Sequence, residues 1–287
     1  MTLTNLHDAL SYAGKEKYAI GAFNLTGEDM LYGILDAAVQ ENSPVIVSIY
    51  EGHLPYLHWE SFMKLVVSEC ERVKVPVVIF LDHASQFKTI YRAFQLGFTS
   101  VMYDGSIHDY ETNIANSKHI SDIAHSLGIS VEAELGTISR VDTTTTKSEN
   151  KHMFMTDPSL VAEFVEKTGI DALAVSIGTV HGYYIGESEI DFSLLSKIND
   201  RANIPLVLHG GTGLKDEEFL QAISLGIRKI NYGTDIFGTS TKTARKILVD
   251  DPDLIMFQDV CIEIRKAVCD RVASYLRLWG SSGKSWL

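Results

Sequence analysis

Three of the ten histidines in this chain stand where predicted strands end. His83 follows a Leu-Asp pair, and His181 and His209 are each followed directly by glycine. Imidazoles that converge from separate strands can form an open zinc site, because catalytic zinc keeps three protein ligands and leaves the remaining position to water or substrate. One such histidine alone would more simply be an unrelated polar residue. Three at equivalent strand ends favour a metal site.

A carboxylate, Asp82, directly precedes the first of these histidines. Neighbouring residues in a strand point to opposite faces, but at a strand end the backbone can turn both side chains toward the same opening. A carboxylate beside a metal site is suited to general acid–base catalysis. The alternative, that Asp82 caps the following helix, stays open at the level of sequence.

Two further carboxylates, Glu132 and Glu134, share one face of the predicted strand 130–135. Burying such groups in an apolar strand is costly unless they are paired or bound to a metal. They could therefore support a metal centre by orienting an imidazole. Asp104, at the end of the predicted strand 100–104, could do the same.

Glycine-rich turns follow the last two predicted strands, where many barrels bind phosphate. Glycines allow backbone N–H groups to approach an anion, and neighbouring threonines can donate hydroxyl groups. Taken singly such turns are weak signals, since tight turns also need glycine, but their position beside His209 strengthens them. The residues concerned are Gly210, Gly211, Thr212, Gly213, Gly233 and Thr234.

The other histidines fall in predicted helices or loops, and we interpret most as surface residues. His53 and His108 follow predicted strands closely enough to reach the same opening, so both stay weak candidates. The three cysteines are scattered and have no zinc-finger spacing, which favours buried or unreactive thiols.

Short β-branched apolar runs alternate with longer amphipathic segments, which is typical of a parallel sheet covered by helices. Eight such units predict one α/β domain over residues 1–287, a (β/α)₈ TIM barrel, although an open doubly wound sheet stays possible. A polar segment at 136–155 and an extra C-terminal helix at 254–278 depart from the repeat. The predicted strands are 18–24, 45–49, 75–82, 100–104, 130–135, 172–177, 206–209 and 229–231. The predicted helices are 28–40, 59–72, 88–96, 111–127, 158–168, 194–201 and 216–225.

Composition narrows the possible partners. The net charge of −12 argues against nucleic acid and anionic membranes as partners, because both would be repelled. A phosphorylated substrate would be repelled too, so any phosphate site must be formed by backbone N–H groups, helix N-termini or a bound cation. No apolar stretch approaches the length that spans a bilayer. The first residues lack the regions of a signal peptide, so we expect a cytoplasmic protein.

Over nearly its full length the chain resembles the class II fructose-bisphosphate and tagatose-bisphosphate aldolases. The segments that carry this resemblance are 18–24, 81–83, 102–106, 131–136, 168–175, 181–182 and 206–211. The resemblance implies a homodimer or homotetramer that cleaves a ketose 1-phosphate or 1,6-bisphosphate to dihydroxyacetone phosphate and an aldehyde. A non-catalytic accessory subunit of an aldolase complex is the alternative, and a zinc hydrolase is less consistent with the phosphate turns.

The resemblance also assigns roles. His83, His181 and His209 would bind Zn²⁺, with Asp104 and Glu134 supporting them, and Asp82 would be the acid–base group for the C4 hydroxyl. Asn231 would contact the dihydroxyacetone phosphate unit. Its phosphate would be held with the help of a monovalent cation, Na⁺ or K⁺, by Gly182, Gly210, Gly211, Thr212, Gly213, Gly233 and Thr234.

Several positions depart from the family pattern, mainly on the aldehyde side. Tyr50 stands where bisphosphate aldolases often have serine, Ile185 where they often have lysine, and Ile107 where many have histidine. The segment 138–142 lacks the usual Gly-Gly-x-Glu-Asp pattern, and Glu149 or Asp142 is its candidate substitute. We therefore expect dihydroxyacetone phosphate chemistry without a preference for fructose 1,6-bisphosphate, on a sugar that lacks the distal phosphate or carries another polar group.

Overall fold

Eight parallel strands close into a barrel in which each strand pairs with the next and β8 pairs with β1. The computed structural model describes residues 2–138, 155–182 and 190–287. The predicted TIM barrel is confirmed, and every predicted strand end lies within two residues of the observed one. The strands are β1 (Ile20–Asn24), β2 (Val45–Tyr50), β3 (Val77–Ala84), β4 (Ser100–Tyr103), β5 (Ser130–Leu135), β6 (Ala172–Val175), β7 (Leu206–Leu208) and β8 (Ile227–Tyr232).

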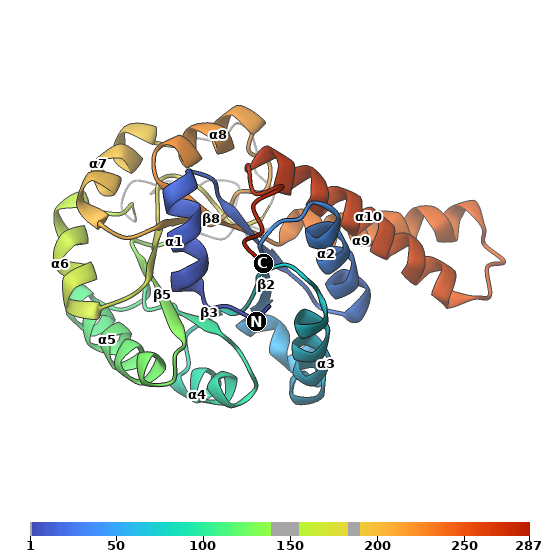
Figure 1. The fold of residues 1–287 in the computed structure, drawn as a ribbon, viewed down its shortest axis with the longest axis horizontal. Coiled ribbons are helices and arrows are strands. Elements are labelled where there is room, and N and C mark those ends of the chain that lie inside the picture. Colours follow the sequence, from blue (N-terminus) through green and yellow to red (C-terminus); the bar gives the residue numbers. More distant parts are fainter. Residues whose placement is uncertain (1, 139–154, 183–189) are drawn as a thin grey trace.

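Helices surround the barrel (Figure 1). Those that follow β1 to β7 agree with the predicted ones within two residues: α2 (Glu28–Gln40), α3 (Trp59–Arg72), α4 (Phe87–Gln95), α5 (Tyr110–Ser126), α6 (Pro158–Thr168), α7 (Phe192–Ala202) and α8 (Asp216–Ser224). The sequence did not predict α1 (Leu6–Glu16), the 3₁₀ helix η1 (Glu51–Tyr56) or α9 (Thr234–Asp250). In the described part of the chain, no helix is both long and apolar enough to cross a membrane.

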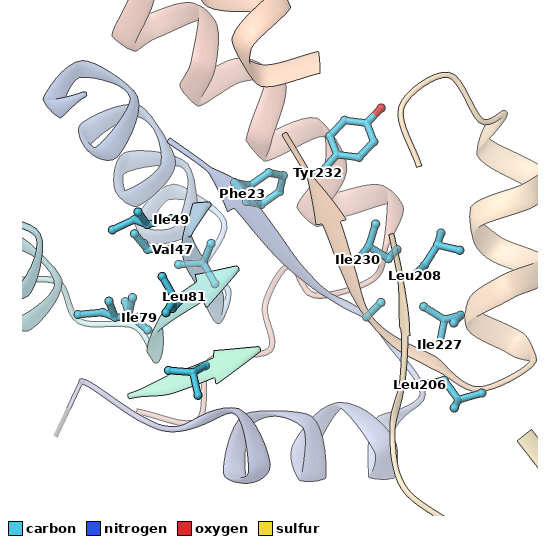
Figure 2. Close-up of a cluster of buried hydrophobic side chains, with 14 of the residues drawn as sticks. Phe23, Val47, Ile49, Ile79, Leu81, Leu206, Leu208, Ile227, Ile230 and Tyr232 are labelled. Carbon is cyan, nitrogen blue, oxygen red and sulfur yellow. The ribbon is translucent and has the colours of Figure 1, made fainter. Parts of the chain in front are cut away.

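The strand alternation sends side chains to two separate cores. One set points outward against the helices, as Figure 2 shows for Phe23, Val47, Leu81 and Ile230. The other set fills the inside of the barrel and consists of apolar residues from most strands: Ile20, Ala22, Ile46, Val78, Phe80, Met102, Ala172, Ala174 and Val207.

Helix α1 closes the N-terminal end of the barrel. Its Leu6 and Leu10 side chains join the inner core. The backbone N–H groups of Leu6 and His7 donate to the Ser100 and Ser130 hydroxyls at 2.8 and 3.0 Å, at the starts of β4 and β5. Helix α1 does not cover the opposite end of the barrel, where the strands finish.

The predicted C-terminal helix is α10 (Phe257–Leu278), which begins three residues later than predicted. With α9 it forms a long hairpin that extends away from the barrel (Figure 1). Helix α10 also packs closely on α2, where a Cβ atom at Gly33 would lie only 2.8 Å from the Arg265 carbonyl oxygen. Arg265 also forms an ion pair with Asp36 at 2.6 Å.

Candidate active site

The carboxyl ends of the strands surround one open cavity of about 340 Å³. This is the end at which TIM-barrel enzymes carry their active sites. Most of the residues predicted from the sequence line it, and three aromatic side chains join them. The lining residues are Asn24, Tyr50, His53, Asp82, His83, His181, Gly182, His209, Gly210, Gly211, Thr212, Asn231, Gly233, Thr234 and Phe237.

The three strand-end histidines come together in this cavity. The ring centroid of His83 lies 4.8 Å from that of His181 and 4.6 Å from that of His209. One nitrogen from each ring can serve as a metal ligand, and these three nitrogens all lie within 4.8 Å of one another. Zinc–nitrogen bonds of about 2.0–2.1 Å in a tetrahedral site place ligand nitrogens roughly 3.3 Å apart. The three imidazoles therefore fit a zinc ion with one open position.

A local backbone irregularity explains how Asp82 and His83 both face the cavity. His83 adopts a left-handed conformation, with φ of 49°, and the pairing of β3 with β4 shifts register between Leu81 and Ala84. Such a bulge re-aims a side chain that regular alternation would send to the other face. The left-handed region is uncommon for residues other than glycine, although histidine is among those enriched there.

Carboxylates fix the orientation of two of the rings. His83 Nδ1 lies 2.8 Å from Asp104 Oδ2, and His209 Nε2 lies 2.8 Å from Glu132 Oε1. An ionised carboxylate only accepts hydrogen bonds, so each of these outer nitrogens donates its N–H. The inner nitrogens, His83 Nε2 and His209 Nδ1, then face the centre, and they are the atoms that would bind a metal ion. This is the usual arrangement of metal-binding histidines.

The two facing rings have opposite pKa shifts. Burial acts to lower the pKa of His83, but the Asp82, Asp104 and Glu134 carboxylates outweigh it and raise the pKa to about 9. Burial, reinforced by His83 and Lys229, holds the pKa of His209 well below its ordinary value. The opposite directions follow from the surroundings, since carboxylates surround His83 whereas His83 and Lys229 lie near His209.

Asp82 is held by two asparagines from other strands. Its carboxylate accepts a hydrogen bond from Asn24 Nδ2 at 2.8 Å and another from Asn231 Nδ2 at 2.7 Å. Burial acts to raise its pKa, but His83, His209 and Lys229 outweigh burial and lower it. The alternative role for Asp82 as a helix cap is wrong, because Gln86 occupies the N-cap position of α4.

The two glutamates of β5 both point into the barrel and are buried. Glu134 Oε1 accepts the Ile138 N–H at 2.9 Å, and its Oε2 lies 3.9 Å from His83 Nδ1. Burial and Asp104 raise the pKa of Glu134 to about 8. Burial also raises the pKa of Glu132, which the Lys229 ammonium opposes.

Most of the predicted phosphate residues line the side of the cavity formed by the ends of β7 and β8. Gly210 has a φ of 69°, a conformation suited to glycine, and a Cβ there would meet the Val180 carbonyl oxygen at 2.5 Å. Helix α9 begins at Thr234 after Gly233, so its positive N-terminus points at the same region. Gly213 does not line this cavity, but a neighbouring hollow that it shares with Thr212.

Aromatic side chains form another wall of the cavity. The His53 ring makes edge contacts with Tyr50 and Phe237, with centroids 5.1 and 5.2 Å apart. The weak candidate His53 thus reaches the opening, carried there by η1, whereas His108 is exposed elsewhere. The departure from the family pattern at Ile185 and the candidate substitutes Asp142 and Glu149 lie outside the described residues.

Sequence reasoning gave no role to Asn24 or Lys229, and it left Glu132 without a named partner. The signal for Asn24 was its place at the carboxyl end of a strand. The signal for Lys229 was a cation two residues before Asn231, on the inward face of β8.

Comparisons with known proteins agree with this geometry. A family model described as fructose-bisphosphate aldolase class-II matches residues 4–284. The chain is 38% identical to the fructose-bisphosphate aldolase of Geobacillus stearothermophilus over 99% of each chain. It is 39% identical to the protein YdjI of Escherichia coli, covering 95% of this chain and 96% of that one. The crystal structure of the YdjI aldolase matches with a TM-score of 0.88 and 37% identity over 99% of both chains.

Proposed function

The chain belongs to the class II fructose-bisphosphate aldolase family, whose members are carbon–carbon lyases, and from this premise we propose a zinc-dependent enzyme that acts on ketose phosphates. It would reversibly cleave a ketose 1-phosphate or 1,6-bisphosphate to dihydroxyacetone phosphate and an aldehyde. The convergence of His83, His181 and His209 beside Asp82 is the observation that carries this proposal.

Asp82 is proposed as the acid–base group. Cleavage requires a base to remove the proton of the C4 hydroxyl, and condensation requires that proton to be returned. The Asn24 and Asn231 amides occupy both carboxylate oxygens and orient them at the cavity wall. When bound at the three histidines, zinc would act as a Lewis acid that stabilises the negative charge left on the dihydroxyacetone phosphate half.

The phosphate of that half is proposed to lie against the Gly210–Thr212 turn and the N-terminus of α9. Backbone N–H groups and a helix dipole can bind an anion without a positively charged side chain. This matters in a chain with a net charge of −12. A monovalent cation at this turn, Na⁺ or K⁺, stays a prediction.

Within this range we propose that a ketose 1-phosphate is preferred, so that the aldehyde half carries no phosphate. No lysine or arginine is among the described residues that line the cavity, and the far wall is formed by Tyr50, His53 and Phe237. The described residues of this wall offer a second phosphate no site comparable to the glycine turns. Hydroxyl groups and C–H faces of a sugar chain suit these rings better.

A coupled assay for dihydroxyacetone phosphate release tests the proposal. Purified protein would be given a panel of ketose 1-phosphates and bisphosphates, with and without a chelator. Turnover that stops with the chelator and returns with zinc supports a zinc aldolase. Metal-independent turnover would overturn the zinc assignment, and a complete lack of turnover would favour the accessory-subunit alternative. Fructose 1,6-bisphosphate turning over far faster than every other sugar would refute the proposed aldehyde.

A further inference from the structure

A fully buried lysine lies inside the barrel beneath the candidate metal centre. Lys229 belongs to β8, and its side chain has no exposed surface. Its Nζ atom lies 2.7 Å from Glu132 Oε2 and 3.9 Å from the centroid of the Phe80 ring. Burying an ammonium group is costly unless it is paired, so this position calls for an explanation.

Lys229 cannot reach a substrate directly, because neither it nor Glu132 lines the cavity. The second oxygen of the Glu132 carboxylate contacts a residue of the candidate metal centre. Glu132 Oε1 lies 2.8 Å from His209 Nε2, and all three side chains are fully buried. The three groups therefore form a continuous chain from β8, through β5, to the histidine that follows β7.

The charges in this chain dictate a hydrogen-bond direction. A lysine ammonium only donates, so Glu132 must accept from it. As the partner of an ammonium, the carboxylate also accepts from His209, which places the N–H of that ring on Nε2. The lone pair is then left on Nδ1, the nitrogen that faces His83 at 2.9 Å.

We propose that Lys229 is a positioning residue that acts through Glu132 to hold His209 in the tautomer and ring orientation that a metal ion requires. The inference rests on the metal site proposed above. The ammonium also lies over the face of the Phe80 ring, where it makes a cation–π contact. Partners of metal-binding side chains of this kind typically change metal affinity or activity by about 10- to 100-fold when removed.

The test compares metal affinity in four proteins: wild type, Lys229→Met, Glu132→Gln and the double variant. Zinc dissociation constants would be measured by competition with a chromophoric chelator. The visible spectrum of the cobalt-substituted proteins would report the ligand set.

We expect Lys229→Met to weaken zinc binding by about 10- to 100-fold and to change the cobalt spectrum. In the Glu132→Gln background, the same lysine substitution should change zinc affinity by less than about twofold, because Lys229 acts only through that carboxylate.

Val78→Ala is the matched control for lost stability. Val78 is buried in the same inner core, on β3, and has no part in the chain of charges. It should lower the melting temperature of the metal-free protein without changing zinc affinity.

Wild-type zinc affinity and spectrum in Lys229→Met would overturn the inference while leaving the metal site intact. Failure of the wild-type protein to bind zinc would instead overturn the proposed site itself. Should Lys229→Met not fold, the comparison of Glu132→Gln with the double variant decides. Equal zinc affinity supports the inference, and a further tenfold loss on removing the lysine overturns it.

Discussion

His83 Nε2 and His209 Nδ1 face each other at a distance of 2.9 Å, although they come from strands on different sides of the barrel. Two lone pairs at this distance would repel, so the contact needs a positive centre between the rings. In the metal-free protein one proton on His83 meets this need, consistent with its raised pKa of about 9. A divalent ion would meet it in the enzyme, with the His181 ring completing the set.

Removal of the third ring should abolish metal binding. We expect His181→Ala to lose zinc and aldolase activity together, because two imidazoles do not make up the three-ligand set of a catalytic zinc site. Zinc content after dialysis and dihydroxyacetone phosphate release would both be measured. His119→Ala is the control, since that ring is exposed on α5, away from the cavity, and shares a hydrogen bond with the Tyr91 hydroxyl. An His181→Ala protein that kept stoichiometric zinc would contradict the assigned ligand set.

Asp82→Asn should separate chemistry from metal binding. The amide keeps the size of the carboxylate but cannot act as a base, so kcat should fall by about 10²- to 10⁴-fold. Zinc content should stay at the wild-type level, because Asp82 contacts Asn24 and Asn231 rather than the inner histidine nitrogens. Normal cleavage by this variant would show that its assigned role is wrong.

Alternation along strands made much of this site predictable. Once Glu132 and Glu134 are placed on one face of an otherwise apolar strand, only an interior with polar partners can hold them. The strand-end histidines were predicted in the same way, since parallel strands of a barrel all finish at one end. The structure adds the bulge that turns His83 beside Asp82.

Contacts across the barrel were not predictable from local pattern. Lys229 and Glu132 are 97 residues apart and belong to strands that do not pair, so only closure of the barrel brings them together. Helix α9 was missed for a different reason. It follows β8 directly and extends away from the barrel with α10, and only Ile236 is buried along it.

The aromatic wall should control the aldehyde and not dihydroxyacetone phosphate. Phe237→Ala removes one ring of the wall that we propose faces the aldehyde, and a contact with an aromatic ring contributes about 0.5–1.5 kcal/mol. We expect the KM for the aldehyde in condensation to rise by about 2- to 12-fold, with little change in the KM for dihydroxyacetone phosphate. Phe257→Ala, at an exposed ring on the hairpin, is the control. Equal changes in both KM values would show that Phe237 acts on the whole cavity instead.

Two glycine substitutions should separate backbone strain from collision at the phosphate turn. Gly210 and Gly169 have nearly the same φ, 69° and 66°, so an alanine at either costs about 1–2 kcal/mol in the left-handed region. Only at Gly210 would the new Cβ also meet backbone, the Val180 carbonyl at 2.5 Å, whereas nothing lies within 4 Å at Gly169. Gly210→Ala should therefore lower the melting temperature more and raise the KM for dihydroxyacetone phosphate. Equal effects of the two substitutions would refute a close-packed turn.

Acid should weaken the cap that starts helix α6. The Asp157 carboxylate accepts hydrogen bonds from the Ser159 N–H and hydroxyl, both at 2.8 Å, and these lower its pKa below the ordinary value. A lowered folded-state pKa means that the cap stabilises fully above the unfolded pKa of about 3.9 and is lost as pH falls through the folded pKa. Asp157→Ala should lower the free energy of unfolding by about 1 kcal/mol at pH 7, measured by urea denaturation. The difference from wild type should shrink as the pH is lowered toward 3.

Asp157→Asn keeps an uncharged acceptor, so its stability relative to Asp157→Ala should not depend on pH. A wild-type advantage over Asp157→Ala that stayed constant down to pH 3 would show that the carboxylate charge contributes nothing to the cap.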